Sequence, residues 1–312
     1  ILSAVPPRPD VALVFSPPLP LPWMICLQGK LRRTPVVVNI QDLFPREAVE
    51  LGVLTNRLLI NLFERMERAV YRLASSVTVH SPGNQVHVFD HGGIPGKVDI
   101  VYNWVNIDQI TPAPRINNFS QQHGLDHKFV VSYAGTMGWA QDMGTIIASA
   151  HKLRDQANIL FLMVGEGIEK EKAIARSIEL GLENILWLPM QPLSVYPYVL
   201  AASDISMINL HPELRTPVVP SKLLSIMAAG RPVVASLPKE SDARLIMTEA
   251  QCGICVDAGD SAALAEAIQK LKEDYNLMKQ MSLSGRAYVE THFSPEICIN
   301  QIEKILARSI GR

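Results

Sequence analysis

The distribution of apolar and polar positions along the chain predicts short buried strands that alternate with amphipathic helices. The runs at 36–38 and 129–133 are apolar on both faces, as buried parallel strands require. Because strand and helix patterns alternate repeatedly, the sequence predicts an α/β fold with parallel sheets and crossover helices. The predicted strands are Val11–Phe15, Val36–Ile40, Val77–His80, Ile100–Tyr102, Val130–Ala134, Ile159–Val164, Ile185–Leu188, Ile205–Ile208, Val233–Ala235 and Gly253–Val256.

The segment 57–73 predicts an amphipathic helix with arginines on one side. Apolar residues recur at helical spacing and leave the arginines on the opposite face. That face could meet anionic lipid, but the interspersed Glu64 and Glu67 favour an ordinary solvated helix face. The apolar positions are Leu58, Leu59, Leu62, Met66, Ala69 and Leu73, and the arginines are Arg57, Arg65, Arg68 and Arg72. A second apolar stretch, 15–27, contains four prolines, which exclude a long helix there.

The segment 219–236 predicts a tight entry, a short helix, a glycine stop and a buried strand. Pro220 and Ser221 supply a rigid start and a cap, and Gly230 ends the helix. The first turn of a helix exposes unpaired N–H groups, and Lys222 adds a positive charge there. This pattern favours binding of an anion such as a diphosphate. The alternative is an ordinary helix whose lysine points to water.

A second candidate anion site follows the predicted strand at 130–134. Gly135 and Gly138 would let the backbone approach a phosphate closely, and main-chain N–H groups could surround it. A plain strand-to-helix turn also uses such glycines. Because this loop and Lys222 would lie at the same edge of a parallel sheet, phosphate contact is the favoured interpretation.

Composition is consistent with an enzyme of about two domains. The chain has 312 residues, 48% of them hydrophobic, and a net charge of −1, so no global basic field would draw it to nucleic acid. No apolar run approaches the ~18 residues of a membrane-spanning helix. The four cysteines are too few for a disulfide scaffold, so a reducing cytoplasm is expected.

Neither the cysteines nor the histidines predict a metal or redox site. Cys252 and Cys255 form one pair with no second pair at ligand spacing. The eight histidines are scattered, and no two are expected to form a helical metal pair with a nearby acid. His80, at the end of a predicted strand, is the one that could lie near a functional site, and a structural role is favoured for it.

Several segments resemble, in the same order, the motifs of the retaining glycosyltransferases of family 4. Pro-Ser-Lys-Leu followed by Met-Ala-Ala-Gly-x-Pro-Val-Val-Ala, at 220–235, resembles their donor-diphosphate motif. The segments at 35–45, 101–105, 131–138 and 164–167 resemble their acceptor-side strand and turn, the Asn-Gly-Val before the linker, the Gly-rich loop of the second domain and a further strand end. The likeness runs from about residue 8 to about residue 295 and is nearest to the bacterial exopolysaccharide and O-antigen branch, such as the colanic acid fucosyl- and N-acetylfucosaminyl-transferases.

The resemblance implies the GT-B architecture, in which two Rossmann-like domains face each other across a cleft. The acceptor-side domain would span 1–110, the donor domain 111–295, and a final helix at 296–312 would cross back to the first domain. The boundary falls in the proline-rich start of the stretch 108–127. The chain opens on a strand that lies deep inside the family's first domain, so roughly the first quarter of the natural protein is expected to be missing.

The resemblance also implies the reaction and its participants. A sugar would pass, with retained anomeric configuration, from a UDP- or GDP-sugar to a saccharide acceptor, lipid-linked at the cytoplasmic membrane face. No metal or further cofactor is expected, and no nucleic acid; peripheral contact with the membrane stays open. The phosphates would lie at 135–138 and Lys222, the base near Leu188 and Met190, and the ribose near Ser225. The implied donor-side residues are Gly135, Thr136, Met137, Gly138, Gly165, Leu188, Met190, Arg215, Pro220, Ser221, Lys222, Leu223 and Ser225.

The chain departs from the family pattern on the donor side. Many members carry an arginine and a lysine where this chain has Thr136 and Met143, so Lys222 must supply more of the charge, with Arg215 helping. Ser225 replaces the second of two glutamates spaced eight apart, with Pro217 at the position of the first. A serine bonds a ribose hydroxyl more weakly than a carboxylate does.

A third departure concerns the acceptor side. Gln41 replaces a histidine, and Asp42 remains beside it. Asp42 could accept a proton from the acceptor hydroxyl or cap the next turn. The candidate catalytic residues are therefore Asp42, Gln41 and Lys222. The departures also leave two rival functions open: a catalytically inactive GT-B partner subunit, and a sugar-nucleotide epimerase that needs no acceptor.

Overall fold

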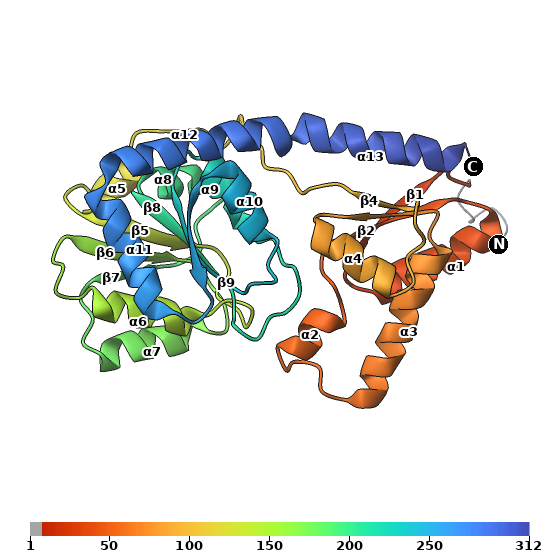
Figure 1. The fold of residues 1–312 in the computed structure, drawn as a ribbon, viewed down its shortest axis with the longest axis horizontal. Helices are drawn as coiled ribbons and strands as arrows, with labels where there is room; N and C mark the ends of the chain where they lie inside the picture. Colours follow the sequence, from red (N-terminus) through yellow and green to blue (C-terminus); the bar gives the residue numbers. More distant parts are fainter. Residues whose placement is uncertain (1–7, 312) are drawn as a thin grey trace. The chain divides into compact units, whose positions relative to one another are not determined.

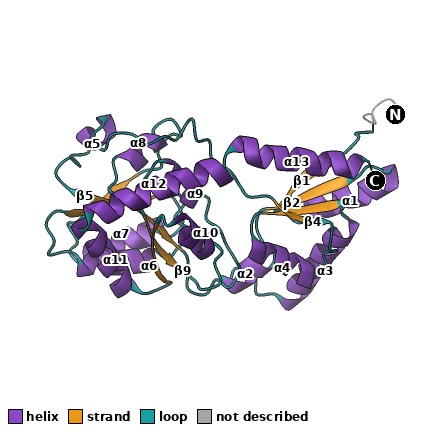
Figure 2. Ribbon diagram, turned by 45° about the horizontal axis from the view of Figure 1, so that its top comes forward, coloured by secondary structure: helices purple, strands orange, loops and turns teal. Residues whose placement is uncertain are grey.

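The computed structural model describes residues 8–311, which form two compact units. The first comprises residues 8–103, 216–218 and 296–311, and the second comprises 104–215 and 219–295. Each unit has its own parallel sheet with helices packed against it (Figures 1 and 2). All ten predicted strands are present, with ends that differ from the prediction by one or two residues in most cases.

The sheet of the first unit has the order β1-β2-β3-β4, and every pairing is parallel. Its strands are β1 (Ala12–Ser16), β2 (Val36–Ile40), β3 (Ser76–Val79) and β4 (Val98–Ile100). The strand β2 is buried along its whole length, and its side chains alternate between two cores: Val36 and Val38 pack on one side, and Val37 on the other. This double burial explains the uninterrupted apolar run in the sequence.

The helices of the first unit are α1 (Pro20–Arg32), α2 (Arg46–Glu50), α3 (Arg57–Leu73), α4 (Pro82–Asp90) and α13 (Pro295–Ile310). Cys26 of α1, Val70 of α3 and Val88 of α4 belong to one core cluster with β2. On the other side, Cys298, Ile302 and Ile305 of α13 pack with Val37. The final helix of the chain therefore closes the core of the first unit.

The helix α1 corrects the expectation that four prolines exclude a long helix in this stretch. It has 13 residues and begins at Pro20, with Pro22 still in its first turn. The N–H groups of a first turn have no partner within the helix, so proline loses nothing there and its fixed φ is already helical. The other two prolines, Pro17 and Pro18, precede the helix.

The sheet of the second unit has the order β10-β9-β8-β5-β6-β7, and its pairings are all parallel. Its central strand places Val131 and Tyr133 in one core, and Val130 and Ala134 in the other. The strands are β5 (Phe129–Ala134), β6 (Ile159–Val164), β7 (Ile185–Leu188), β8 (Ile205–Asn209), β9 (Val233–Leu237) and β10 (Gly253–Asp257). The helices are α5 (Asn118–Gln122), α6 (Met143–Lys152), α7 (Lys170–Glu179), α8 (Tyr196–Ala201), α9 (Lys222–Ala228), α10 (Ala243–Ala250), α11 (Ser261–Glu273) and α12 (Tyr275–His292).

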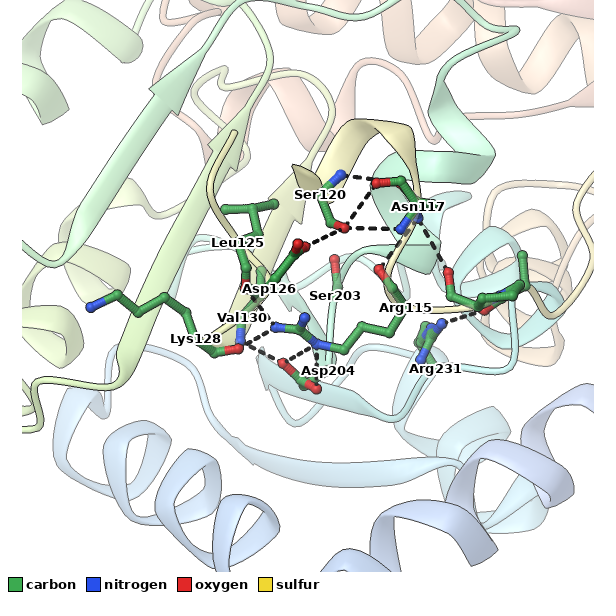
Figure 3. Close-up of polar contacts among 12 residues, drawn as sticks. Arg115, Asn117, Ser120, Leu125, Asp126, Lys128, Val130, Ser203, Asp204 and Arg231 are labelled. Carbon is green, nitrogen blue, oxygen red and sulfur yellow. Dashed lines mark hydrogen bonds and ion pairs between the residues drawn. The ribbon is translucent and has the colours of Figure 1, made fainter. Parts of the chain in front are cut away.

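The segment that leads into the second unit is held by arginines. Arg286 of α12 donates to the carbonyls of Ile107, Ile110 and Ala228. Arg231 donates to the carbonyl of Ala113, as Figure 3 shows. These bonds begin before residue 111, so the division of the structure after 103 comes earlier than the boundary expected at 110.

A second arginine contact holds the chain just before β5, the first strand of this sheet in the sequence (Figure 3). Arg115 donates through Nε to both carboxylate oxygens of Asp204, at 2.8 and 2.9 Å. Asp204 also accepts from the backbone N–H of Val130 at 2.7 Å. The Asn117 side chain then caps α5, and the Ser120 side chain reciprocates at the Asn117 N–H. These contacts anchor the residues after the linker to the first strand of the sheet.

Candidate functional site

The order of the second sheet marks where a ligand would bind. From β5 the chain builds β6 and β7 on one side, then crosses to place β8 on the other side of β5. In parallel α/β sheets, ligands bind beyond the carboxyl ends of the two strands at such a switch point. Gly135 directly follows β5, and the loop after β8 leads to Lys222 at the start of α9. The two segments expected to contact phosphate thus belong to the two strands of the switch point.

Lys222 and Gly135 lie against each other. A Cβ atom built on Gly135 would lie 3.4 Å from Nζ of Lys222, so a larger residue would crowd the ammonium group. Gly135 also has a φ of +140°, which residues with a side chain rarely adopt. Nζ of Lys222 thus lies beside Gly135, as expected for two segments at the same edge of the sheet.

Tyr133 holds the Lys222 side chain. Nζ of Lys222 donates to the Tyr133 hydroxyl at 2.6 Å and lies 3.9 Å from the centre of its ring. The hydroxyl in turn donates to the carbonyl of Thr136. Desolvation lowers the pKa of Lys222 to about 7, because burial disfavours the charged form. An anion placed beside the nitrogen would restore the charge.

The loops after β5 and β6 approach each other through glycines. Added Cβ atoms would lie 1.9 Å from the Gly135 carbonyl at Gly165, and 2.1 Å from the Met137 carbonyl at Gly167. No real side chain tolerates such distances, so both positions require glycine. The sequence prediction included Gly165, and its effect here is to fix the shape of the loop at Gly135.

Most amides of the loop 135–138 already have partners. The N–H groups of Gly135, Met137 and Gly138 donate to the Val164 carbonyl, the Glu166 carbonyl and the Gln141 side chain. Within residues 8–311, the Thr136 N–H has no such partner, and its side chain is exposed. The Met137 side chain is fully buried in the core, so it cannot contact a donor as expected. Met143 is likewise a core residue.

The helix α9 begins and ends where predicted, with one correction. Gly230 has a φ of +61°, and the N–H groups of Gly230 and Arg231 bond back to the carbonyls of Met227 and Ile226. These two hydrogen bonds form the Schellman motif that ends the helix. Ser221 occupies the cap position, but its side chain accepts no capping hydrogen bond, because its backbone is helical rather than extended.

The other residues expected along the donor site are placed as follows. Pro220 is half-buried, and its carbonyl accepts a hydrogen bond from the N–H of Leu223. The Leu223 side chain is fully buried and therefore cannot face a ligand. Burial raises the pKa of Tyr196, and Ser225, which lies near the Tyr196 hydroxyl, partly offsets that effect. Arg215, which was expected to add positive charge beside Lys222, pairs with Glu240 at 3.5 Å on the surface.

Lys170 is a site residue that the sequence analysis missed. Its ammonium group donates to the Gly165 carbonyl at 2.8 Å and the Leu188 carbonyl at 3.3 Å. It also pairs with Glu166, and this contact lowers the pKa of that carboxyl. Lys170 thus fastens the ends of β6 and β7 together, while Met190 just beyond is exposed. No local motif signals this role, because its partners are backbone carbonyls at the ends of two neighbouring strands.

In the first unit, Gln41 is fixed by two asparagines. Its side-chain N–H group donates to Asn39, and its carbonyl accepts from Asn103 at 2.9 Å. Asn103 belongs to the motif that precedes the linker, so two predicted segments meet at this point. Gln41 thus places a fixed side-chain amide, which does not titrate, where many family members have a histidine.

Beside Gln41 lies a cluster of ionisable groups, Asp42, Glu47 and His80. Desolvation raises the pKa of Asp42, and His80 partly offsets that effect. Burial and the charges of Asp42 and Glu50 raise the pKa of Glu47 to about 7. His80 is buried and contacts the Ile40 carbonyl and the Asn84 amide. A carboxyl with a pKa near 7 can exchange protons at neutral pH. Glu47 was not among the candidates expected from the sequence.

The capping alternative for Asp42 is wrong for α2. This helix begins at Arg46, with Pro45 at the cap position and no side-chain cap. Asp42 and Glu47 instead line an open pocket of about 200 Å³ whose remaining walls are Pro17, Phe44, Ala48, Leu51 and Val53. Two carboxyl groups thus border a largely apolar hollow.

Two expectations about metal-binding residues fare differently. Burial raises the pKa of the Cys252 thiol to about 12 and of the Cys255 thiol to about 11, which disfavours their reactive thiolate forms. No helical metal pair of histidines with a nearby acid was expected from the sequence, yet the structure brings two histidines and an acid together. His87 and His91 stack on each other at the end of α4, and Glu67 of α3 hydrogen-bonds His87.

Comparison with known proteins identifies the family. The model of "Glycosyl transferases group 1" matches residues 115–288, and that of "Glycosyl transferase 4-like domain" matches residues 2–104. The chain belongs to the group 1 glycosyltransferases. The two matches together cover both predicted domains, which confirms the resemblance drawn from the sequence motifs.

Similar proteins come from several bacteria. The probable glycosyltransferase WbjE of Pseudomonas aeruginosa is 23% identical over 85% of this chain. WcaI of Escherichia coli, which its name assigns to colanic acid biosynthesis as a glycosyl transferase, is 23% identical over 90% of the chain. The chain spans 66% of the length of WbjE and 71% of that of WcaI.

Solved structures of glycosyltransferases share the fold. HepE of Anabaena, crystallised with UDP, has a TM-score of 0.80 at 20% identity, over 95% of this chain and 79% of HepE. WaaG, a glycosyltransferase of lipopolysaccharide biosynthesis, has a TM-score of 0.69 at 16% identity, over 89% of this chain and 80% of WaaG. The GT-B fold that the sequence predicted is thereby confirmed.

Proposed function

We propose that this group 1 glycosyltransferase transfers a sugar from a UDP- or GDP-sugar to a saccharide acceptor of surface polysaccharide biosynthesis, with retained configuration and without a metal. The observation that carries the donor assignment is the contact between Lys222 and Gly135 at the switch point of the second sheet. The similarity to HepE, which binds UDP and UDP-glucose in its crystals, supports a uridine donor.

The donor side supplies charge where the leaving group develops it. Departure of the nucleoside diphosphate leaves negative charge on its phosphate oxygens, and a preorganised positive group nearby lowers the barrier. Lys222 is that group, with the unpaired amide of Thr136 as a second donor. The diphosphate would take the place of the Tyr133 hydroxyl as the partner of Nζ. Lysine charge and backbone donors thus do the work that a metal does in other transferases.

The acceptor side would be the cluster of Asp42, Glu47 and His80 and the pocket beside it. A carboxylate at Asp42 can orient the acceptor hydroxyl, and Glu47 can take up a proton at neutral pH. The apolar walls of the 200 Å³ pocket suit an acceptor with an apolar portion, such as a lipid-linked saccharide.

The surface of α3 supports work at a membrane. The sequence pattern predicted a buried leucine face, but Leu58, Leu59 and Leu62 are 80%, 44% and 51% exposed. The face that is buried consists of Glu67, Val70 and Tyr71 in the second half of the helix. In Figure 1 the first half of α3 extends past the strands of the first unit.

Exposed leucines beside arginines are typical of helices that lie in an anionic membrane surface. Arg57 and Arg65 are exposed on the same half of α3. The test is sedimentation with vesicles that contain about one third phosphatidylglycerol. A double substitution, Leu58→Ser with Leu62→Ser, should weaken binding by roughly tenfold or more, since burial of one leucine side chain contributes about 1.5–3 kcal/mol of free energy. Leu283→Ser, which changes a leucine 65% exposed on α12, is the control. Equal binding by all three proteins would refute this surface.

The donor assignment is tested by calorimetry with UDP and GDP. Lys222→Met should abolish or strongly weaken binding, whereas Lys279→Met, an exposed lysine on α12, should not. Transfer with a panel of labelled UDP- and GDP-sugars then separates the rival functions. An inactive partner subunit would bind the donor without hydrolysing it, and an epimerase would release free sugar without an acceptor. Proton NMR of the product decides whether configuration is retained.

A further inference from the structure

The helices α3 and α4 bring together three side chains of the kinds that bind transition metals. They are Glu67 from α3, and His87 and His91 from α4 and its last turn. One potential ligand atom from each lies within 4.8 Å of the other two. The Glu67 carboxylate and Nε2 of His87 are 3.0 Å apart, and the two imidazole rings stack at 3.9 Å with an interplanar angle of 17°. We propose that these residues bind one divalent transition-metal ion, of which zinc fits best.

The hydrogen bonds around His91 leave its other nitrogen ready for a metal. Nδ1 of His91 contacts the His87 carbonyl at 2.8 Å. A carbonyl only accepts hydrogen bonds, so Nδ1 carries the proton and Nε2 keeps its lone pair. Histidines that bind metals in proteins donate their other N–H group in this way, which fixes both the tautomer and the ring orientation.

The Glu67 carboxylate is held in place by a hydrogen bond from a neighbouring side chain, as metal-binding carboxylates in proteins commonly are. It is 1% exposed and accepts a hydrogen bond from the Tyr71 hydroxyl at 2.9 Å. A buried carboxylate is costly unless its charge is compensated. Tyr71 is neutral, and burial together with the Glu67 charge raises its pKa further. A divalent cation would compensate the carboxylate directly.

The donor atoms select the kind of ion. Two imidazole nitrogens and one carboxylate oxygen suit zinc, whereas calcium and magnesium prefer oxygen ligands alone. Zinc bonds of about 2.0–2.1 Å in a tetrahedron place ligand atoms roughly 3.3 Å apart, which small side-chain movements would reach. The proton on Nε2 of His87 would move to Nδ1 as Nε2 coordinates, so a neutral ring releases no net proton. Three protein ligands leave the fourth position to water.

A bound ion would link α3 to α4 within the first unit. Arg72 is also close, since a Cβ atom on Gly92 would lie 3.3 Å from its Nε. This positive charge opposes a cation bound nearby and should weaken its binding. The site does not depend on the proposed transferase activity and can be tested without substrate.

The test is titration of the chelator-treated chain with zinc chloride, followed by calorimetry and by metal analysis after dialysis. We expect one zinc per chain and a rise in melting temperature on binding. His91→Gln should weaken binding by more than about 100-fold, because loss of a partner behind a ligand alone costs 10–100-fold. This variant keeps the contacts among Glu67, Tyr71 and His87. His127→Gln, an exposed histidine of the second unit, is the matched control.

Two further measurements make the result decisive. Cobalt in place of zinc should give visible absorption typical of four-coordinate sites, and Glu67→Gln should reduce it. Circular dichroism of each variant reports whether it is folded. Zinc binding that is absent from the parent chain overturns the proposal. So does binding that survives both His91→Gln and Glu67→Gln, because the ion would then lie elsewhere.

Discussion

Binding of the sugar nucleotide should take up a proton at alkaline pH. In the free protein the pKa of Lys222 is lowered to about 7 by desolvation, and its nitrogen faces the Tyr133 hydroxyl rather than a carboxylate. A diphosphate beside Nζ favours the charged form and should return the pKa to the usual range of lysine, about 10.4. The expected signature is therefore a change in the protonation of a single lysine on binding.

The size of the effect follows from these two pKa values. At pH 8 a group with a pKa of about 7 is roughly 10% protonated, and one with a pKa above 10 is almost fully protonated, so about 0.9 proton is taken up. At pH 6 both states are protonated and the uptake approaches zero. The dissociation constant should be flat below pH 7 and rise by up to about tenfold per pH unit above it.

The sign for stability is consistent with this. Between about pH 7 and the ordinary pKa of lysine, the unfolded chain binds the proton that the folded chain lacks. The ligand-free protein should therefore gain stability as pH rises through this window, while the complex should not.

Calorimetry at pH 8 in buffers of different ionisation enthalpy measures the proton count directly. A UDP-sugar is the right ligand, because its doubly esterified diphosphate does not itself titrate between pH 6 and 9. The weak binding that Lys222→Met retains at high ligand concentration should show no uptake, whereas Lys279→Met should bind and take up the proton as the parent chain does. Tight binding without proton uptake at pH 8 would show that the diphosphate does not contact Lys222.

Three further changes test other parts of the structure. Asp42→Asn should cut transfer by roughly 100-fold or more, yet leave the melting temperature nearly unchanged, since Asp42 caps no helix; a normal transfer rate would remove Asp42 from the reaction. Gly165→Ala should lower the free energy of unfolding by about 2 kcal/mol or more and weaken UDP binding, because its Cβ would collide with the Gly135 carbonyl. Denaturant unfolding measures the stability and calorimetry the affinity. An unchanged stability and affinity would contradict the close approach of the two loops. Asp204→Ala should lower the free energy of unfolding by about 3 kcal/mol in the same assay, because it leaves Arg115 and the Val130 N–H without their partner. A decrease of less than about 1 kcal/mol would mean that the Arg115–Asp204 pair is dispensable.

The sequence predicted the strands well because parallel strands buried on both faces leave continuous apolar runs, such as 36–38. It also located Lys222 and Gly135, since each lies in a local pattern of glycine, proline and charge next to a strand. The stop at Gly230 is equally local. Features of this kind depend on a few neighbouring residues, so they can be inferred without the rest of the fold.

Other features depend on contacts that spacing does not encode. The helical period identified α3 and placed Met66 and Leu73 against the core, but the leucines of its first half, Leu58, Leu59 and Leu62, are exposed. Met137 lies in a loop with exposed neighbours, yet its side chain enters the core. Lys170 binds backbone carbonyls, and Glu67 meets His87 across two helices. Each of these requires knowledge of which elements pack together.

The bonds from Arg286 determine where the second unit can be separated from the chain. A fragment that begins at 111, the boundary expected from sequence, would lack the carbonyls of Ile107 and Ile110. Of these three carbonyls, the Arg286 guanidinium would keep only that of Ala228, the last residue of the helix that starts with Lys222. A fragment that begins at 104 keeps all three carbonyls. The seven residues from 104 to 110 are thus part of the packed structure of the second unit rather than a spacer, and their deletion should disturb the helix α9, which begins at Lys222.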